Sequence, residues 1–139
     1  MPADLTKAGT SRLRDEWMTK VRLDKIAYAR SGDKGAGANI GVIAHTPRGY
    51  EFLRERLTSD VVRNYFSRLN PGNVVRYEMP NLGALNFILP TILDGGGSVS
   101  LRIDAQGKSL GQALLELAID VPDELFPELV RQSGSQAAG

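Results

Sequence analysis

The sequence predicts a single α+β domain of two layers, with a mostly antiparallel sheet and helices on one face. Three observations lead to this prediction. The chain has 139 residues, and 42% of them are hydrophobic, which suits one domain with one modest core. Strand patterns and amphipathic helix patterns follow one another in the order β-β-α-α-β-α-β-α. Strands with alternate polar residues are typical of a sheet that is covered on only one face.

The first two expected strands flank a long polar loop. Residues 21–30 are predicted to form the first strand and residues 39–45 the second. The stretch over residues 30–39 contains three glycines together with arginine, serine, aspartate and lysine. Because these residue types are typical of loops, we expect a loop over residues 30–39.

The rest of the chain is expected to alternate helices with strands. Thr46 and Pro47 have the residue types of a helix cap and a first helical position. Ser109 and Gln112 have the spacing of a capping box. The expected elements are helices over 47–57, 58–69, 85–92 and 109–119 and strands over 74–79 and 99–103, with the glycines 95–97 after the third helix.

Composition excludes several classes of function. The formal net charge of +1 gives no electrostatic basis for binding nucleic acid or a membrane surface. The chain has no cysteine and one histidine, so we expect neither disulfides nor a zinc site, and no cofactor motif is present. No apolar run approaches the ~20 residues of a membrane span, and the first residues resemble no secretory signal. We therefore expect a cytoplasmic protein.

The loop over residues 30–39 is the candidate site. Glycines allow positive φ angles and let backbone N–H groups converge on a ligand. Arg30 and Lys34 add positive charge, and Arg30 is suited to bind a carboxylate or phosphate through two hydrogen bonds. Asp33 is the candidate general base, or else it holds Lys34 or Arg30 in place, and Lys34 is the second candidate catalytic residue. The predicted substrate-binding residues of the loop are Arg30, Ser31, Gly32, Gly35 and Asn39.

An ordinary hairpin loop is the alternative interpretation of this stretch, with Ser31 and Asp33 in local turns. Known phosphate-binding patterns do not fit. Ile40 stands where Gly-x-Gly-x-x-Gly needs its last glycine, and the Gly-Lys-Ser tripeptide at 107–109 fits a turn and a helix cap. The number of chemically active side chains favours a site over a plain turn.

Two further amides complete the candidate set. Asn81 and Asn86 are predicted to bind a substrate carbonyl, or else to cap their own loop and helix. His45 follows a strand and is interpreted as an exposed or capping residue. Tyr28 and Tyr77 are interpreted as core residues.

Four segments, taken in order, resemble a known family. They are IAYARSGDKGAGANIGVIA (26–44), VVRYEMPNLGALNFIL (74–89), DGGG (94–97) and SLRIDAQGKSLGQALLELAI (100–119). The combination is similar to the AtuA-like ferredoxin-fold domain, named after the acyclic terpene utilisation protein, and covers roughly residues 22–119. The resemblance implies a ferredoxin-like fold over residues 21–130, between a flexible extension (1–20) and a disordered tail (131–139).

The same resemblance implies a role in the breakdown of branched, terpenoid or alicyclic acyl-CoA compounds. In the protein that names the family, this domain follows a much larger one, whereas stand-alone forms are encoded beside a large partner. The first hypothesis is therefore a small subunit of a two-component enzyme of the lyase type, such as an acyl-CoA hydratase. The expected partners are a large AtuA-type subunit and an acyl-CoA-like molecule, in a homo- or hetero-oligomer. The alternative is a non-catalytic assembly module for a larger partner.

Overall fold

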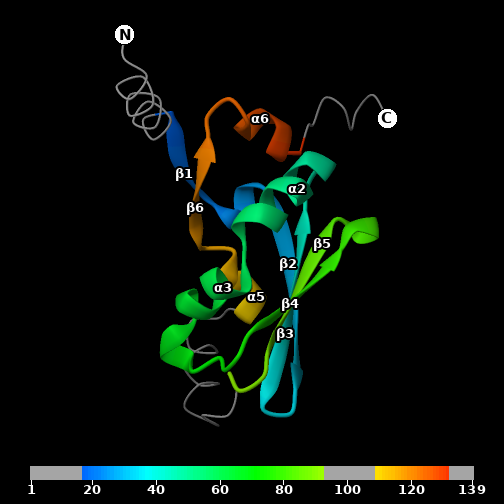
Figure 1. Cartoon of the computed structure of the whole chain (residues 1–139), viewed down its shortest axis with the longest axis vertical. Coiled ribbons are helices and arrows are strands. Elements are labelled where there is room, and N and C mark those ends of the chain that lie inside the picture. Colours follow the sequence, from blue (N-terminus) through cyan, green and yellow to red (C-terminus); the bar gives the residue numbers. More distant parts are fainter. Residues whose placement is uncertain (1–16, 93–108, 132–139) are drawn as a thin grey trace, which may run out of the picture.

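The structure, a computed structural model, describes residues 17–92 and 109–131 (Figure 1). The predicted α+β class is confirmed. The helices and strands are β1 (Met18–Arg22), β2 (Ala27–Lys34), β3 (Gly37–Ala44), α2 (Pro47–Arg56), α3 (Ser59–Tyr65), β4 (Val75–Met79), β5 (Ala84–Leu89), α5 (Leu110–Leu114), β6 (Ala118–Pro122) and α6 (Phe126–Leu129).

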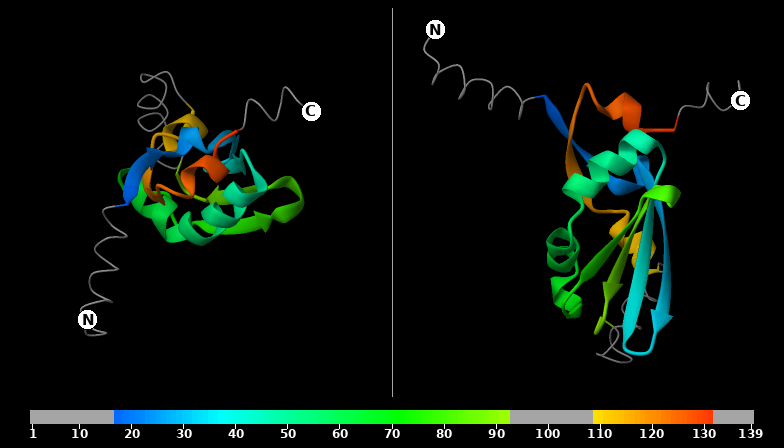
Figure 2. Two further views of the ribbon diagram at one scale, coloured as in Figure 1. Left: turned by 90° about the horizontal axis from the view of Figure 1, so that it is seen from above. Right: turned by 45° about the vertical axis from the view of Figure 1, so that its right-hand side comes forward.

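The main sheet has four strands in the order β2-β3-β5-β4, and each neighbouring pair is antiparallel. A separate antiparallel ribbon joins β1 to β6. Helices α2 and α3 lie on one side of the four-stranded sheet (Figure 2). The opposite side is left uncovered by the elements in the described ranges, and most of its side chains are exposed or half-buried.

The hydrophobic core lies between the sheet and the helices. The sheet contributes buried side chains that alternate along β3 and β5, and the helices contribute an apolar stripe. Burying each of these large side chains stabilises the fold by about 1.5–3 kcal/mol. The main members are Ile40, Val42, Leu85, Phe87, Leu89, Phe52, Leu53, Leu57 and Val62.

The predicted loop over residues 30–39 is wrong, because this stretch forms a tight β-hairpin. Strands β2 and β3 pair over eight residues each, from Ala27 opposite Ala44 to Lys34 opposite Gly37. Only two residues connect them, and Gly35 there has a φ of +60°, which glycine adopts without strain. Glycines and charged residues are uncommon in strands, so local propensity misled the prediction. Pairing of β3 with β2 and with β5 outweighs that propensity.

The predicted helix over residues 85–92 is also wrong. Residues 84–89 form β5, a central strand that pairs with both β3 and β4. Leu85, Phe87 and Leu89 alternate into the core. Short apolar runs match helical and strand spacing equally well, and here the two strand partners decide the outcome.

Two other boundaries differ from the prediction. The helix expected over 109–119 ends at Leu114, and residues 118–122 form β6 instead. The strand expected over 21–30 is interrupted by a 3-10 turn at Leu23–Lys25, and β1 begins at Met18, inside the predicted extension. The strand expected over 99–103, the glycines 95–97 and most of both predicted tails lie outside the described residues.

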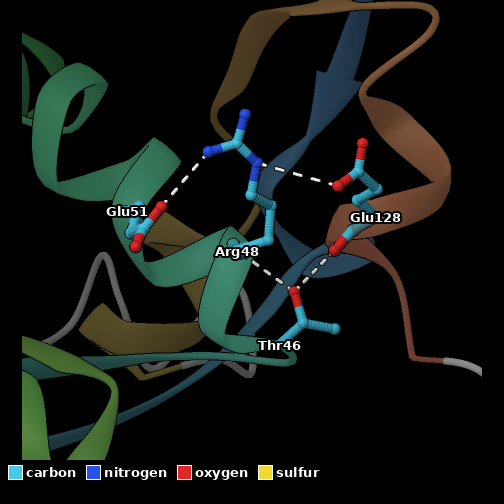
Figure 3. A network of polar contacts seen from close by, with 5 residues as sticks. Thr46, Arg48, Glu51 and Glu128 are labelled. Carbon is cyan, nitrogen blue, oxygen red and sulfur yellow. Dashed lines mark hydrogen bonds and ion pairs between the residues drawn. The ribbon is translucent and has the colours of Figure 1, made fainter.

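The predicted start of α2 is confirmed, with Thr46 as its cap and Pro47 in its first turn. The Thr46 hydroxyl accepts a hydrogen bond from Gly49 N (2.9 Å) and donates one to the carbonyl oxygen of Glu128 (2.7 Å). Arg48 forms ion pairs with Glu51 and Glu128 at the same place (Figure 3). Thr46 therefore caps α2 and ties it to α6.

We predict that Thr46→Ala lowers the free energy of unfolding by about 1–2 kcal/mol, because it removes both hydrogen bonds. Urea denaturation measures the change. Thr46→Ser keeps the hydroxyl and should cost less. Thr58→Ala, at the cap of α3, removes a bond to Val61 N (3.2 Å) without breaking a tie between helices, so it should also cost less. An equal loss of unfolding free energy in Thr46→Ala and Thr58→Ala would contradict a stabilising role for the hydrogen bond between Thr46 and α6.

Candidate functional site

The uncovered side of the four-stranded sheet, called here the open face, carries three rows of side chains. The strand registers place Arg30, Gly41, Asn86 and Tyr77 side by side across all four strands. The neighbouring rows are Gly32, Asn39, Ile88 and Val75 on one side and Tyr28, Ile43, Ala84 and Met79 on the other. Residues that are distant in the sequence therefore meet on one surface.

A hollow of about 570 Å³ lies over this face. Glycines and Ala84 leave its floor low, and Tyr28, Met79 and Leu82 form apolar walls. Its lining residues are Tyr28, Arg30, Ser31, Gly32, Asn39, Gly41, Ile43, Met79, Leu82, Ala84 and Asn86. Volumes of this order are typical of small-molecule sites.

Two asparagine side chains meet in the hollow. Asn39 Nδ2 donates a hydrogen bond to Asn86 Oδ1 at 3.2 Å, and both residues are half-buried. Arg30 is exposed and faces Asn86 across Gly41. The hollow therefore combines an amide pair, a guanidinium and a low glycine floor, which suits an oxygen-bearing ligand.

Five of the predicted site residues line the hollow, namely Arg30, Ser31, Gly32, Asn39 and Asn86, and all of them except Ser31 belong to the open face. These residues come from two segments that are distant in the sequence, and the pairing of β3 with β5 brings the two segments together.

Ser31 and Asp33 belong to the other face of β2, because successive side chains of a strand point in opposite directions. Ser31 borders the hollow, but its Oγ accepts a hydrogen bond from Gly111 N (3.1 Å) at the start of α5. Asp33 is exposed near the tip of the hairpin. Lys34 is the last residue of β2, and Gly35 lies in the turn.

Asn81 lies in the turn between β4 and β5, whereas Asn86 lies on β5 itself. It lines a second hollow of about 550 Å³, between that turn and the start of α2, together with His45, Tyr50 and Arg54. The two predicted amides therefore belong to different hollows that share Leu82 on their rims.

Sequence reasoning missed the exposed apolar side chains of the open face. Tyr77 is 56% exposed and Leu82 is 64% exposed, whereas Tyr77 was interpreted as a core residue. Tyr28, Val75 and Met79 are exposed as well. The alternation of residues 74–79 correctly grouped Val75, Tyr77 and Met79, but it carried no information on which side the helices would cover.

His45 lies beside the open face and packs against Tyr28, with ring centroids 5.5 Å apart. Burial lowers the pKa of the His45 imidazole, and the charge of Arg131 lowers it further, against a smaller opposing effect of a hydrogen bond to the Lys25 backbone. Its Nδ1 is buried without a hydrogen-bond partner in the described part of the chain. The folded chain therefore favours neutral His45.

Within residues 17–92 and 109–131, no group of three or more histidine, aspartate or glutamate side chains is placed to hold a metal ion. None of the helices in those ranges combines the length and the apolar character needed to cross a bilayer.

Comparison with known families gives a match over most of the chain. The sequence model of the AtuA ferredoxin-like domain matches residues 21–120, which confirms the resemblance seen in the motifs. Searches of curated proteins and of solved structures find no match to this chain.

We predict that Gly41→Ala leaves the free energy of unfolding unchanged or raises it by up to about 1 kcal/mol. A Cβ at Gly41 would lie 3.9 Å from Arg30 O and from Asn86 Oδ1, which is ordinary contact. Gly37→Ala in the same strand should instead cost about 1–3 kcal/mol, since its Cβ would lie 2.8 Å from Pro90 O. Urea denaturation compares the two variants. Equal destabilisation would show that Gly41 serves the fold and not the hollow.

We also predict that stability falls as the pH drops below about 6.5. The pKa of His45 is lowered in the folded chain, so the unfolded chain binds the proton more readily, and protonation favours unfolding. His45 is the only histidine, so His45→Gln should flatten this dependence. Urea denaturation at pH 7.5 and 5.5 measures the slope. An unchanged slope in the variant would contradict the assignment.

Proposed function

This chain belongs to the AtuA ferredoxin-like domain family, and from this premise we propose that it is the small subunit of a two-component enzyme. The enzyme acts in the cytoplasm on branched, terpenoid or alicyclic acyl-CoA compounds. The observation that carries the proposal is the hollow on the open face, where Arg30, Asn39 and Asn86 lie together on a glycine floor.

The hollow supports a site of which this chain supplies one side and a second subunit supplies the other. It is lined by groups that can bind an oxygen atom, and its surroundings are an exposed apolar surface that a second protein could cover. Tyrosine and methionine are enriched at protein interfaces, and Tyr77 and Met79 lie together on β4 as exposed side chains. We propose that the large AtuA-type subunit docks on this face and encloses the acyl group.

The proposed chemistry is hydration of an α,β-unsaturated acyl-CoA. Water gives up one proton as its oxygen bonds to the β-carbon, the C=C π bond breaks, and a proton is delivered to the α-carbon, so no oxidant or reductant is needed. Negative charge develops on the thioester oxygen during this step. Arg30 and the amides of the hollow are suited to stabilise that charge.

Asp33 remains the proposed proton-transfer residue of this chain, and Lys34 is proposed to stabilise the enolate oxygen or bind a phosphate. The alternation of β2 puts Asp33 on the face opposite Arg30, close to the hairpin tip. A catalytic role for Asp33 therefore requires the large subunit to enclose the tip as well as the open face.

The alternative function is a non-catalytic assembly module. The exposed apolar residues favour it: Tyr28, Val75, Tyr77, Met79 and Leu82 form a surface that can serve docking alone. The two proposals differ in what Arg30 does, since an assembly module does not need it for turnover.

We predict that the tagged chain, purified from its native host, carries a large partner in fixed stoichiometry, which mass spectrometry identifies. Tyr77→Arg should weaken this complex at least about tenfold, because it places a charge in the apolar surface. A chain that returns alone, as a homo-oligomer, would contradict the subunit proposal.

Turnover of the recovered complex separates the two functions. Arg30→Ala should keep the partner and lower turnover of an unsaturated acyl-CoA about 10²-fold or more, and Asp33→Asn should lower it as well. Arg68→Ala, an exposed arginine outside the hollow, is the control. Full turnover with Arg30→Ala favours the assembly module, and full turnover with Asp33→Asn removes Asp33 from the mechanism.

A further inference from the structure

We propose that Asn39 is a positioning residue that orients the Asn86 amide, so that Asn86 Nδ2 and Arg30 together bind one carbonyl oxygen. The ligand class is a planar carbonyl compound, with a thioester as the form that the proposed function requires. The inference rests on the proposed function for that choice, but the orientation itself is a property of this chain alone.

The hydrogen bond between the two amides sets the orientation. Asn39 Nδ2 can only donate, and it donates to Asn86 Oδ1 at 3.2 Å. The acceptor end of Asn86 is therefore occupied, and its two Nδ2 hydrogens remain for other partners. Rotating the Asn86 amide by 180° would bring two NH₂ groups against each other, which is unfavourable.

The sheet holds both asparagines firmly. Asn39 stands on β3, which pairs with β2 and β5, and Asn86 stands on β5, which pairs with β3 and β4. Asn39 is directly opposite Ile88 and Asn86 is opposite Gly41, so the two amides are diagonal neighbours on one face. Diagonal neighbours are within reach of long side chains.

Two glycines make room for the arrangement. A Cβ at Gly32 would lie 3.1 Å from Asn39 Oδ1 and would press on that amide. Gly41 separates Arg30 from Asn86 along their row, so no side chain stands between the guanidinium and the amide. Neither glycine has a positive φ, so backbone conformation does not require them.

The donors define the ligand. Arg30 has five N–H donors and no acceptor, and Asn86 presents the donor end of its amide. The residues that line the hollow include no aspartate or glutamate. An oxygen acceptor is favoured over a cation, and the low floor favours a flat group such as a thioester over a tetrahedral one.

The substitution Asn39→Asp tests the positioning role. At pH 7.5 the introduced carboxylate can only accept, so the Asn86 amide should rotate, donate its Nδ2 to the carboxylate and turn Oδ1 toward the hollow. At pH 3, below the ordinary aspartate pKa of about 3.9, the introduced carboxyl is largely protonated, and its O–H donates to Asn86 Oδ1 as the Asn39 amide did. The original orientation is then restored.

The measurement is a ¹H–¹⁵N spectrum of the side-chain amides of the full chain, titrated with S-ethyl thioacetate. This thioester is neutral, so the added charge does not repel it. We expect saturable shifts of the Asn86 NH₂ signals in the unmodified chain at both pH values. For Asn39→Asp we expect about tenfold weaker binding at pH 7.5 and recovery at pH 3.

Asn64→Asp is the matched control, because Asn64 is exposed on α3, on the helix side of the sheet. It should bind the thioester as the unmodified chain does. Unchanged binding in Asn39→Asp at pH 7.5, or loss at both pH values, overturns the positioning role. Absence of a saturable shift in the unmodified chain overturns the proposal that Asn86 Nδ2 and Arg30 bind a carbonyl oxygen. Neither measurement requires a partner or turnover, so failure here is distinct from failure of the proposed function.

Discussion

Antiparallel pairing in the order β2-β3-β5-β4 determines which side chains share a face, and the hollow depends on it. Helices cover one face, so the inward positions of β3 and β5 must be apolar. The outward positions are free of that demand. Gly32 and Gly41 occupy two of them, where glycine usually weakens a strand. Since neither has a positive φ, the structural reason for them is space above the sheet.

The sequence allowed the fold class to be predicted, together with the elements that have strong local signals. Thr46 and Pro47 mark the start of α2, and residues 74–79 show a clear period of two. The hairpin and β5 were missed because their stability comes from partners far along the chain. Asn86 pairs with Gly41 on one side and Tyr77 on the other, and no local pattern around residue 86 reveals either neighbour.

The candidate site was predicted as a set of residue types and not as a geometry. Arg30, Asn39 and Asn86 were chosen because arginine and amides bind oxygen atoms, and the sheet brings them together. Ser31 and Asp33 were chosen for equally good chemical reasons. In a loop their side chains could share a site with Arg30, but in a strand successive side chains point to opposite faces. Once residues 27–34 are known to be a strand, neighbouring residues can no longer share a face.

Because the hairpin turn has only two residues, the pairing of β2 with β3 fixes which residues of β2 face the hollow and which face the helices. Loss or gain of a single residue between Ala27 and Arg30 would exchange the faces of β2 beyond that point, bringing Ser31 and Asp33 over the hollow and Arg30 under the helices. Changes of two residues would keep the faces and move only the tip. Length variation in this hairpin should therefore be tolerated in steps of two, which separates the evolution of the tip from that of the hollow.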